Sequence, residues 1–200
     1  MIHPIELESY QILRSRIDLE ALGYGPLAQA VVARVIHSSA DLELGQAMHV
    51  NEEDAAAGIK AIQSGEPIIC DVEMVSHGIT GLETHCFLSK VKDLKIEPDL
   101  TRSAAGIRMA ANAFPEGGIW VVGCAPTALF EIINLVKQSA IAPTLVVGMP
   151  VGFVGAAESK QALRESGITA ISNVGEKGGS AMAAAVVNAL VRIANAEVSQ

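Results

Sequence analysis

The pattern of apolar and polar positions in the second half of the chain repeats one local unit three times. In each unit, a short apolar run with β-branched residues ends in a turn that contains glycine, and the turn leads into a helix of small residues. Strands that alternate with helices predict a mostly parallel sheet covered by helices on both faces, an α/β three-layer sandwich of about five strands. The three units join Ile119–Gly123 to Ala125–Lys137, Thr144–Gly148 to Ala156–Ser166, and Thr169–Gly175 to Gly179–Ala194.

Two prolines mark helix starts in the first part of the chain. Pro4, followed by acidic residues in the first turn, predicts a helix that ends near Ile17, and Pro26 predicts a second helix that ends near His37. The first helix carries an apolar stripe at helical spacing, made of Ile5, Ile12, Leu13 and Ile17.

Between these helices and the repeated units, the sequence indicates two more helices and two strands. Asn51 with Asp54 three residues later is typical of a helix start, and Gly65 ends that helix. Alternating positions predict a strand over Pro67–Val75. A shorter strand over His85–Leu88 and a helix over Thr101–Phe114 complete the set.

Composition narrows the class of protein. The chain fits a single domain over residues 1–200, and because 50% of the residues are hydrophobic, a large aliphatic core is available. The formal net charge of −8, with no cluster of Lys and Arg, argues against a nucleic-acid partner. The stretch Gln138–Ala157 has no charged residue, but its prolines and glycines indicate a strand and a loop, so we expect no membrane partner.

The three cysteines are isolated, and no two of them form a CxxC motif. We therefore expect reduced thiols in a cytoplasmic protein, a location that the lack of a visible signal peptide also favours. Cys70 and Cys124 lie in apolar runs, which predicts that both are buried as small hydrophobic side chains. His77 and His85 are too far apart for a known metal motif, so we expect no metal bound by the protein.

The turns after the strands are candidate anion sites, because helix N-termini offer free backbone N–H groups. Gly148–Gly155 lacks the spacing of the dinucleotide and phosphate-loop motifs, so these turns support nucleotide binding only as an alternative. Gly178, Gly179 and Ser180, which precede an alanine-rich helix, form a better cradle for an anion. The competing interpretation is that these glycines serve tight turns and close helix packing.

Ser9 and His37 are candidates for chemistry. Ser9 lies within the apolar stripe of the first helix, where its hydroxyl either bonds to the helix backbone or faces a ligand. His37 ends the second helix, and Ala30 and Ala33 on the same face leave room for a bulky ligand. Because a helix C-terminus favours the imidazolium form, His37 either donates a proton near neutral pH or caps its own helix.

Arg102 stands at the predicted start of its helix, where the helix dipole favours acids rather than cations. With Thr101 and Ser103 it suits a carboxylate ligand, and the alternative is a solvated or salt-bridged arginine. Asp71 and Glu73 share a face of the predicted strand, either as paired carboxylates or as acceptors of backbone N–H bonds.

A series of segments in one order covers nearly the whole chain: His3–Ser9 with Ile12–Asp18, Arg34–His37, Pro67–Val75 (PIICDVEMV), Thr101–Ala105 (TRSAA), Gly123–Phe130 (GCAPTALF), Gly148–Lys160 (GMPVGFVGAAESK) and Gly178–Ala185 (GGSAMAAA). Together these segments resemble the precorrin-8X methylmutase family, which includes aerobic and cobalt-dependent anaerobic enzymes. The segment Gly148–Lys160 is long enough to be highly specific. Cys124 departs from the family's pattern, in which asparagine is more usual.

The resemblance implies an isomerase of cobalamin (corrin) biosynthesis. Members of the family move a methyl group from C-11 to C-12 of precorrin-8X or cobalt-precorrin-8, to give hydrogenobyrinic or cobyrinic acid. Since the methyl group is already on the substrate, no cofactor is implied, and cobalt enters only as part of the substrate. The family also implies a flavodoxin-like fold, a homodimer with sites near the interface, and a polycarboxylate tetrapyrrole as substrate.

The resemblance assigns roles to individual residues. His37 matches the family's active-site histidine, and Ser9 and Arg102 match its substrate-contacting serine and arginine. We add further candidates for substrate binding: Arg14, Ser103, Thr80, Gly179 and Ser180. Two alternatives are a tetrapyrrole carrier, in which His37 binds substrate cobalt without chemistry, and a nucleotide-using α/β enzyme.

Overall fold

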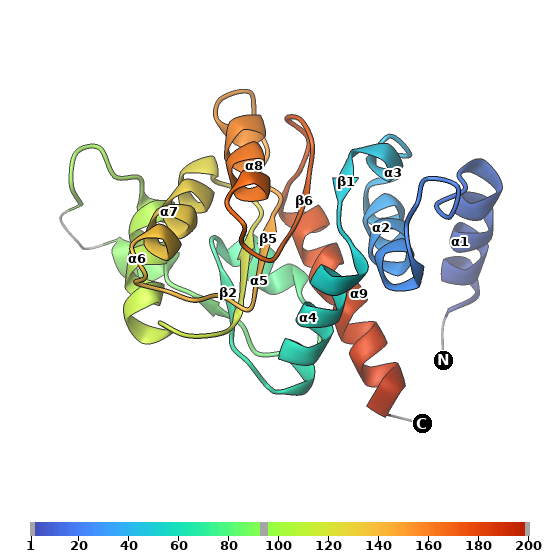
Figure 1. Cartoon of the computed structure of the whole chain (residues 1–200), viewed down its shortest axis with the longest axis horizontal. Helices are drawn as coiled ribbons and strands as arrows, with labels where there is room; N and C mark the ends of the chain where they lie inside the picture. Colours follow the sequence, from blue (N-terminus) through green and yellow to red (C-terminus); the bar gives the residue numbers. More distant parts are fainter. Residues whose placement is uncertain (1–2, 93–95, 199–200) are drawn as a thin grey trace.

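The computed structural model describes residues 3–92 and 96–198, in which six strands form one sheet. Helices cover both faces of this sheet (Figure 1). Neighbouring strands are parallel, except that β1 and β6 are antiparallel. The order across the sheet is β1 (Met48–His49), β6 (Ala170–Asn173), β5 (Leu145–Gly148), β4 (Ile119–Val122), β2 (Ile68–Cys70) and β3 (His85–Cys86).

The expected α/β fold with a mostly parallel sheet is confirmed, although the described sheet has six strands where about five were expected. The unexpected strand is β1, which pairs with β6 through Met48 and His49. A strand of two residues has no alternating pattern that the sequence could reveal, because it is shorter than the window in which a period is recognised.

Each face of the sheet carries its own group of helices. On one face lie α6 (Arg102–Ala113), α7 (Pro126–Lys137) and α8 (Ala156–Glu165), and on the other lie α2 (Pro26–Ser39), α4 (Glu52–Gln63), α5 (Glu73–Gly78) and α9 (Ser180–Val198). The short α3 (Leu44–Ala47) follows α2, and a 3₁₀ helix (Leu88–Val91) follows β3. The first helix, α1 (Pro4–Arg16), packs against α2 at the outer edge of the molecule (Figure 1).

Side chains of the central strands alternate between two cores. Ile119 and Val121 of β4 pack into the core beneath α2, α4, α5 and α9, whereas Trp120 and Val122 pack into the core beneath α6, α7 and α8. Because both faces of the sheet are buried, strands such as β4 are continuous apolar runs rather than alternating ones.

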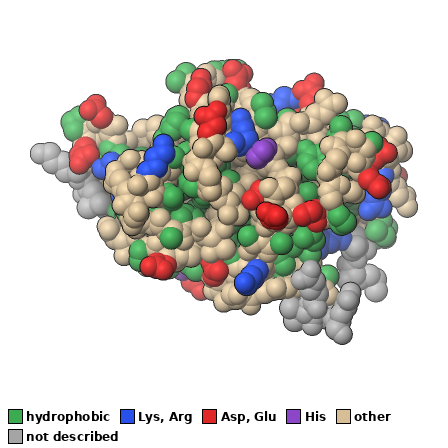
Figure 2. Space-filling view, in the orientation of Figure 1, with side chains coloured by type: hydrophobic (Ala, Val, Ile, Leu, Met, Phe, Trp, Pro, Cys, Tyr) green, Lys and Arg blue, Asp and Glu red, His purple; other side chains and the backbone are tan. Residues whose placement is uncertain are grey.

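The surface is mixed in charge. Figure 2 shows Lys and Arg side chains dispersed among acidic and apolar ones on the face that carries β1 and α8. Apolar side chains also reach the upper edge of this view, over the loop between β5 and α8, where Phe153 and Val154 are 90% and 87% exposed.

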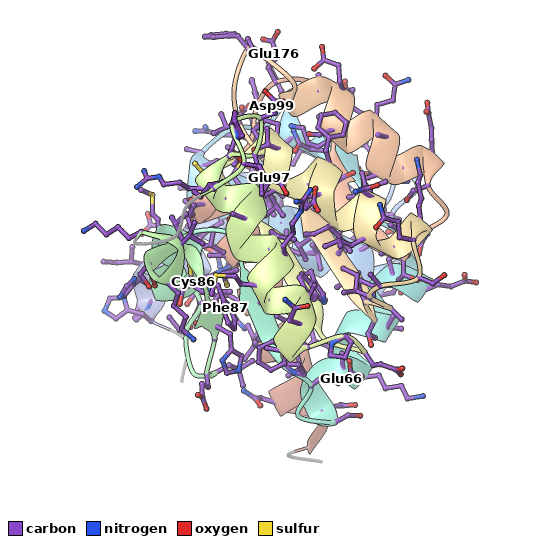
Figure 3. The ribbon with its side chains drawn as sticks, turned by 90° about the vertical axis from the view of Figure 1, so that its left-hand side faces the viewer. Glu66, Cys86, Phe87, Glu97, Asp99 and Glu176 are labelled. Atoms are coloured by element: carbon purple, nitrogen blue, oxygen red, sulfur yellow. The ribbon has the colours of Figure 1, made fainter. Side chains whose placement is uncertain are left out.

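The strand ends define two opposite ends of the molecule. In Figure 3, Glu66, which precedes β2, lies at the lower end, and Glu176, which follows β6, lies at the upper end. Since parallel strands all finish at the same edge, the loops after β2, β4, β5 and β6 gather at the upper end. That edge is where candidate ligand-binding loops are brought together.

The strand prediction over Pro67–Val75 is wrong in its extent. The strand ends at Cys70, and α5 begins at Glu73. Val72, Val75 and Ile79 have the spacing of a helix. Within the short segment Pro67–Val75, this spacing is not distinguishable from the alternating pattern of a strand. The strand expected over His85–Leu88 is also shorter, because a 3₁₀ helix replaces its end.

The helix α1 is sparsely packed in the single chain. Leu13 is its one buried residue among those described, while Ile5 and Ile12 are 69% and 44% exposed. Its apolar stripe is therefore only partly buried within one copy of the chain, because Leu13 and Ile17 pack against the core and Ile5 and Ile12 do not. Helices of this length gain most of their stability from tertiary packing, so much of this apolar surface remains without a partner here.

A test of the fold uses two glycines in different surroundings. A methyl group added at Gly123 would lie 2.6 Å from Val75 Cγ2 and 2.8 Å from Ser180 Cα, so Gly123→Ala is expected to lower the free energy of unfolding by about 1–3 kcal/mol. Gly106→Ala is the matched control, since its methyl group would stand 3.4 Å from Leu88 N and the substitution favours the helix. Urea denaturation measures both, and equal stability of the two variants would contradict the packing described.

Candidate active site

The side chain of His37 contacts two consecutive residues of α1. Its Nδ1 atom lies 2.8 Å from Oγ of Ser9, and its ring stacks on the Tyr10 ring with centroids 5.0 Å apart and planes 13° from parallel. The partner of the Ser9 hydroxyl is thus the side chain of His37 and not the carbonyl four residues earlier in the helix. The two contacts fix the place and the plane of the half-buried imidazole, and they leave Nε2 without a hydrogen bond among the described residues.

The local sequence places His37 in the last turn of α2. Pro26 stands in the first turn after Gly25, and Ala40 ends the helix in the left-handed conformation, with φ 54°. The N–H of Ala40 donates to the Ile36 carbonyl at 2.7 Å. His37 therefore lies where the partial negative charge of the helix end favours a cation.

A groove of about 730 Å³ lies between α1, α2 and α9. Ala30 and Ala33, the small residues expected beside His37, line it. Tyr10 both lines the groove and stacks on His37, so the imidazole meets the groove through this ring rather than forming part of its wall. The volume is in the range of pockets that take small organic ligands.

Three arginines line the same groove: Arg14, Arg34 and Arg192. Glu6 pairs with Arg34 at 3.0 Å and with Arg192 at 2.8 Å. Arg14 is exposed and has no ion-pair partner in the described part of the chain, so it is available to an anionic ligand. Small side chains beside a free guanidinium group suit a ligand that has both apolar surface and carboxylates.

Arg102 does not lie near His37 in one copy of the chain, because α6 and α2 cover opposite faces of the sheet (Figure 1). Arg102 is exposed and has no ion-pair partner within residues 3–92 and 96–198. Thr101 precedes it as the N-cap of α6, and its Oγ1 lies 2.7 Å from Thr127 Oγ1 of α7. Ser103 is half-buried in the first turn of the same helix.

The remaining candidates lie at or beside α9. Ser180 begins this helix and is 8% exposed, and the N–H of Gly179 donates to the Met149 carbonyl at 2.8 Å, so that donor is already bonded. Thr80 follows α5, and both its N–H and its Oγ1 donate to Asn188 Oδ1, at 2.9 Å and 3.2 Å. None of these three residues hydrogen-bonds to His37.

Asp71 accepts backbone N–H bonds, one of the two roles open to it from the sequence. Its carboxylate receives the N–H groups of Gly123, Cys124 and Ala125 at 3.0, 2.9 and 3.0 Å, directly before α7. Burial raises the pKa of the Asp71 carboxyl, and these donors offset part of that effect. Glu73 lies in α5 and not on a strand face with Asp71, so no carboxylate pair forms.

This carboxylate occupies the crevice in which open α/β sheets usually bind their ligands. The strand order reverses between β2 and β4, and such a switch point is the common ligand site. Because Asp71 already accepts the N–H groups of Gly123, Cys124 and Ala125, these donors are not available to the phosphate of a nucleotide.

Lys160 was not identified from the sequence. Its side chain is fully buried in α8, where Nζ donates to Asn173 Oδ1 at 3.2 Å and to the carbonyl of Lys177. Burial lowers the pKa of this ammonium group to about 8. A signal was present, since Ala156, Lys160 and Leu163 share the apolar face of one helix, where a lysine is unusual.

The thiols differ from one another in exposure. Cys70 is buried as expected, and burial raises the pKa of its thiol. The same expectation for Cys124 is wrong, because this residue lies in the turn after β4 and is exposed. Among the described residues no three His, Cys, Asp or Glu side chains gather as a metal site, and none of the helices is long and apolar enough to cross a membrane.

Comparison with known proteins points to one family. A family model described as precorrin-8X methylmutase matches residues 4–193. A cobalt-precorrin-8 methylmutase of Methanocaldococcus jannaschii is 40% identical over 197 residues, which cover 95% of this chain and 93% of that protein. A cobalt-precorrin-8 methylmutase of Priestia megaterium is 38% identical, with 98% and 93% covered. A crystal structure of the precorrin-8X methyl mutase of Thermus thermophilus matches with a TM-score of 0.82 and 34% identity, and covers 98% of this chain and 99% of that one.

The buried ammonium group of Lys160 makes stability depend on pH. Its pKa is about 8 in the folded protein and near 10.5 in the unfolded chain, so the unfolded chain binds more protons between these values. Stability is therefore expected to rise between pH 8 and 10.5, by at most about 3 kcal/mol. Urea denaturation of the wild type and of Lys160→Met at several pH values measures this term, and a stability difference that does not change with pH would contradict it.

Proposed function

The chain belongs to the precorrin-8X methylmutase family, and we propose that His37 is the residue through which it moves a methyl group from C-11 to C-12 of precorrin-8X or cobalt-precorrin-8. The chain is thus an isomerase of cobalamin biosynthesis, with hydrogenobyrinic or cobyrinic acid as product. The observation that carries the role of His37 is its contact with Ser9 and Tyr10 at the side of an arginine-lined groove.

The reaction is an intramolecular migration. The bond from the methyl carbon to C-11 breaks as the bond to C-12 forms, in a suprafacial 1,5-sigmatropic shift, so no methyl donor or electron acceptor is required. Protonated His37 hydrogen-bonds the conjugated ring near the migration terminus, or transfers its proton to the ring and takes a proton back after the methyl group has moved. This contact localises positive charge and lowers the barrier, an effect of about 10²–10⁴-fold for a well-placed acid.

Ser9 and Tyr10 prepare His37 for this role. The hydroxyl of Ser9 holds Nδ1, which directs Nε2 to the substrate, and the Tyr10 ring keeps the plane of the imidazole fixed. A proton donor is effective only when its position relative to the substrate is fixed, and these two contacts supply that geometry.

The substrate carries many carboxylates, and the groove offers cations for them. Arg14 is the free guanidinium group of the groove, and we assign it to one substrate carboxylate. Ser103, Thr80, Gly179 and Ser180 remain further candidates. Because Gly179 N–H is already bonded to Met149, any contribution of Gly179 comes from the shape of the turn rather than from that donor.

A second copy of the chain completes the proposed site. Arg102 and His37 lie on opposite faces of one sheet, so a single substrate does not reach both within one copy. The exposed Ile5 and Ile12 of α1 supply apolar surface for a homodimer beside the groove. In this arrangement Arg102 of one copy faces the substrate held by His37 of the other.

The order of the strands supports a finer classification of the fold. The five parallel strands, numbered among themselves in chain order, run 2-1-3-4-5, which supports a flavodoxin-like class with β1 as an added edge strand. We assign the whole of residues 1–200 to this one domain, and a cytoplasmic location suits free cysteines.

His37→Asn tests the catalytic assignment. Asparagine keeps a polar side chain but has no proton to give, so the rate is expected to fall roughly 10²–10⁴-fold. Precorrin-8X and cobalt-precorrin-8 are each incubated with the protein, and absorbance and mass are followed together, because the product has the mass of the substrate and a different chromophore.

His77→Asn is the control, since His77 is exposed and bonds only within α5 among the described residues. Turnover by His37→Asn at the wild-type rate would remove His37 from catalysis. Tight binding with a shifted spectrum and no product, in the wild type itself, would identify a carrier instead.

Arg102→Ala tests the contribution of α6. Loss of a charged hydrogen-bond donor is expected to weaken substrate binding about tenfold or more, with stability unchanged or slightly higher, because a cation leaves a helix N-terminus. Lys137→Ala, which removes an exposed cation at the end of α7, is the control. Titration of the substrate by absorbance gives the affinities, and equal values for the wild type and Arg102→Ala would return Arg102 to a solvated surface role.

A further inference from the structure

Lys160 carries a buried ammonium group that has no role in the reaction described above. The side chain is 0% exposed, and no carboxylate pairs with it among the described residues. A buried cation without a counter-ion is costly unless its N–H groups are hydrogen-bonded. The two acceptors of Lys160 therefore have to keep their positions, because moving them would leave the buried charge without hydrogen bonds.

Both acceptors belong to the end of β6 and to the loop Val174–Gly179 that follows it, the β6–α9 loop. Asn173 accepts from Lys160 Nζ through Oδ1 at 3.2 Å, and the carbonyl of Lys177 is the second acceptor. The same carbonyl also receives Asn173 Nδ2 at 2.8 Å. The loop is thus folded around the ammonium group. Through these bonds, the ammonium group joins the end of β6 and the loop itself to α8.

The β6–α9 loop in turn holds the segment that leaves α2. The N–H of Val174 donates to the Ala47 carbonyl at 2.8 Å. The side chain of Lys177 pairs with Asp41 and Glu43, each at 2.6 Å. Asp41 comes four residues after His37, so the two ion pairs connect the loop to the turn that follows the helix of the imidazole, and the main-chain bond connects it to the end of α3.

Resting on the proposed function, we infer that Lys160 is a positioning residue of the methylmutase site: its ammonium group shapes the β6–α9 loop, which holds the end of α2 and so keeps His37 against Ser9. Lys160 does not touch the substrate. Its effect passes through the loop and through Lys177, and it acts on the geometry of the proton donor rather than on the groove that binds the ring.

Lys160→Met is the first test, because methionine removes the charge and keeps much of the length of the side chain. Since a displacement of a catalytic group by about 1 Å costs up to about 10²-fold, kcat is expected to fall about 10- to 100-fold, while KM changes less than about threefold. The ring-proton NMR signals of His37 are expected to shift. Lys137→Met, at an exposed lysine of α7, is the control and is expected to match the wild type.

Lys177→Met separates positioning from stability. Lys177 is half exposed, so its loss leaves the core intact and removes only the ion pairs to Asp41 and Glu43. A fall in kcat of roughly three- to tenfold, with shifted His37 signals, is expected, because part of the link to α2 remains through the backbone. If Lys160→Met does not fold, Lys177→Met tests whether the β6–α9 loop positions His37.

The two hypotheses fail in different ways. Absence of product with the wild type overturns the proposed function, and the His37 signals still report on positioning, since they do not require turnover. Conversion by the wild type, together with wild-type kcat and unshifted His37 signals in Lys177→Met or in folded Lys160→Met, overturns the role of Lys160.

Discussion

The three hydrogen bonds that Asp71 accepts from Gly123, Cys124 and Ala125 occupy the free N–H groups of the turn before α7, which an anionic ligand could otherwise use. This turn follows β4, next to the point between β2 and β4 at which the strand order reverses and an open α/β sheet usually binds its ligand. A carboxylate of the chain itself thus lies where the N–H groups of the turn would hold an anion. The groove proposed for the substrate lies instead between α1, α2 and α9, beside the sheet rather than over its strand ends.

In a site on a sheet, the hydrogen bonds between strands hold the residues in place. A site between helices lacks these bonds, so contacts of side chains and loops have to hold its residues. The imidazole of His37 is held by α1, through Ser9 and Tyr10, and the end of α2 is held by the β6–α9 loop around Lys160. Two buried charges, one acidic and one basic, thus organise the upper edge of the sheet. Each is satisfied mainly by backbone groups and amides, which ties loop conformation to charge.

The net charge of −8 gives a polycarboxylate substrate no long-range attraction, so recognition depends on cations at short range. Arg14 in the groove and Arg102 at the start of α6 have no ion pairs among the described residues, whereas Arg34 and Arg192 are neutralised by Glu6. Arg14 and Arg102 are thus both available to carboxylates, but they lie on opposite sides of the sheet. Their separation across the sheet is the physical reason that the proposed site includes a second copy of the chain.

Local periodicity was sufficient to determine the class of the fold and the places of its repeated units, because a strand, a glycine turn and a helix each leave their pattern within about ten residues. The bounds were right to within one or two residues, except that α9 extends to Val198. Local periodicity also identified Ser9 and His37 separately. Only the tertiary structure decided that their side chains meet at 2.8 Å, that Asp71 accepts the N–H groups of the turn after β4, that Lys160 is buried, and that Cys124, Ile5 and Ile12 are exposed. The reason is physical: periodicity is a property of neighbouring residues, whereas the partner of a hydroxyl, a carboxylate or an ammonium group depends on the path of the chain between residues far apart in sequence.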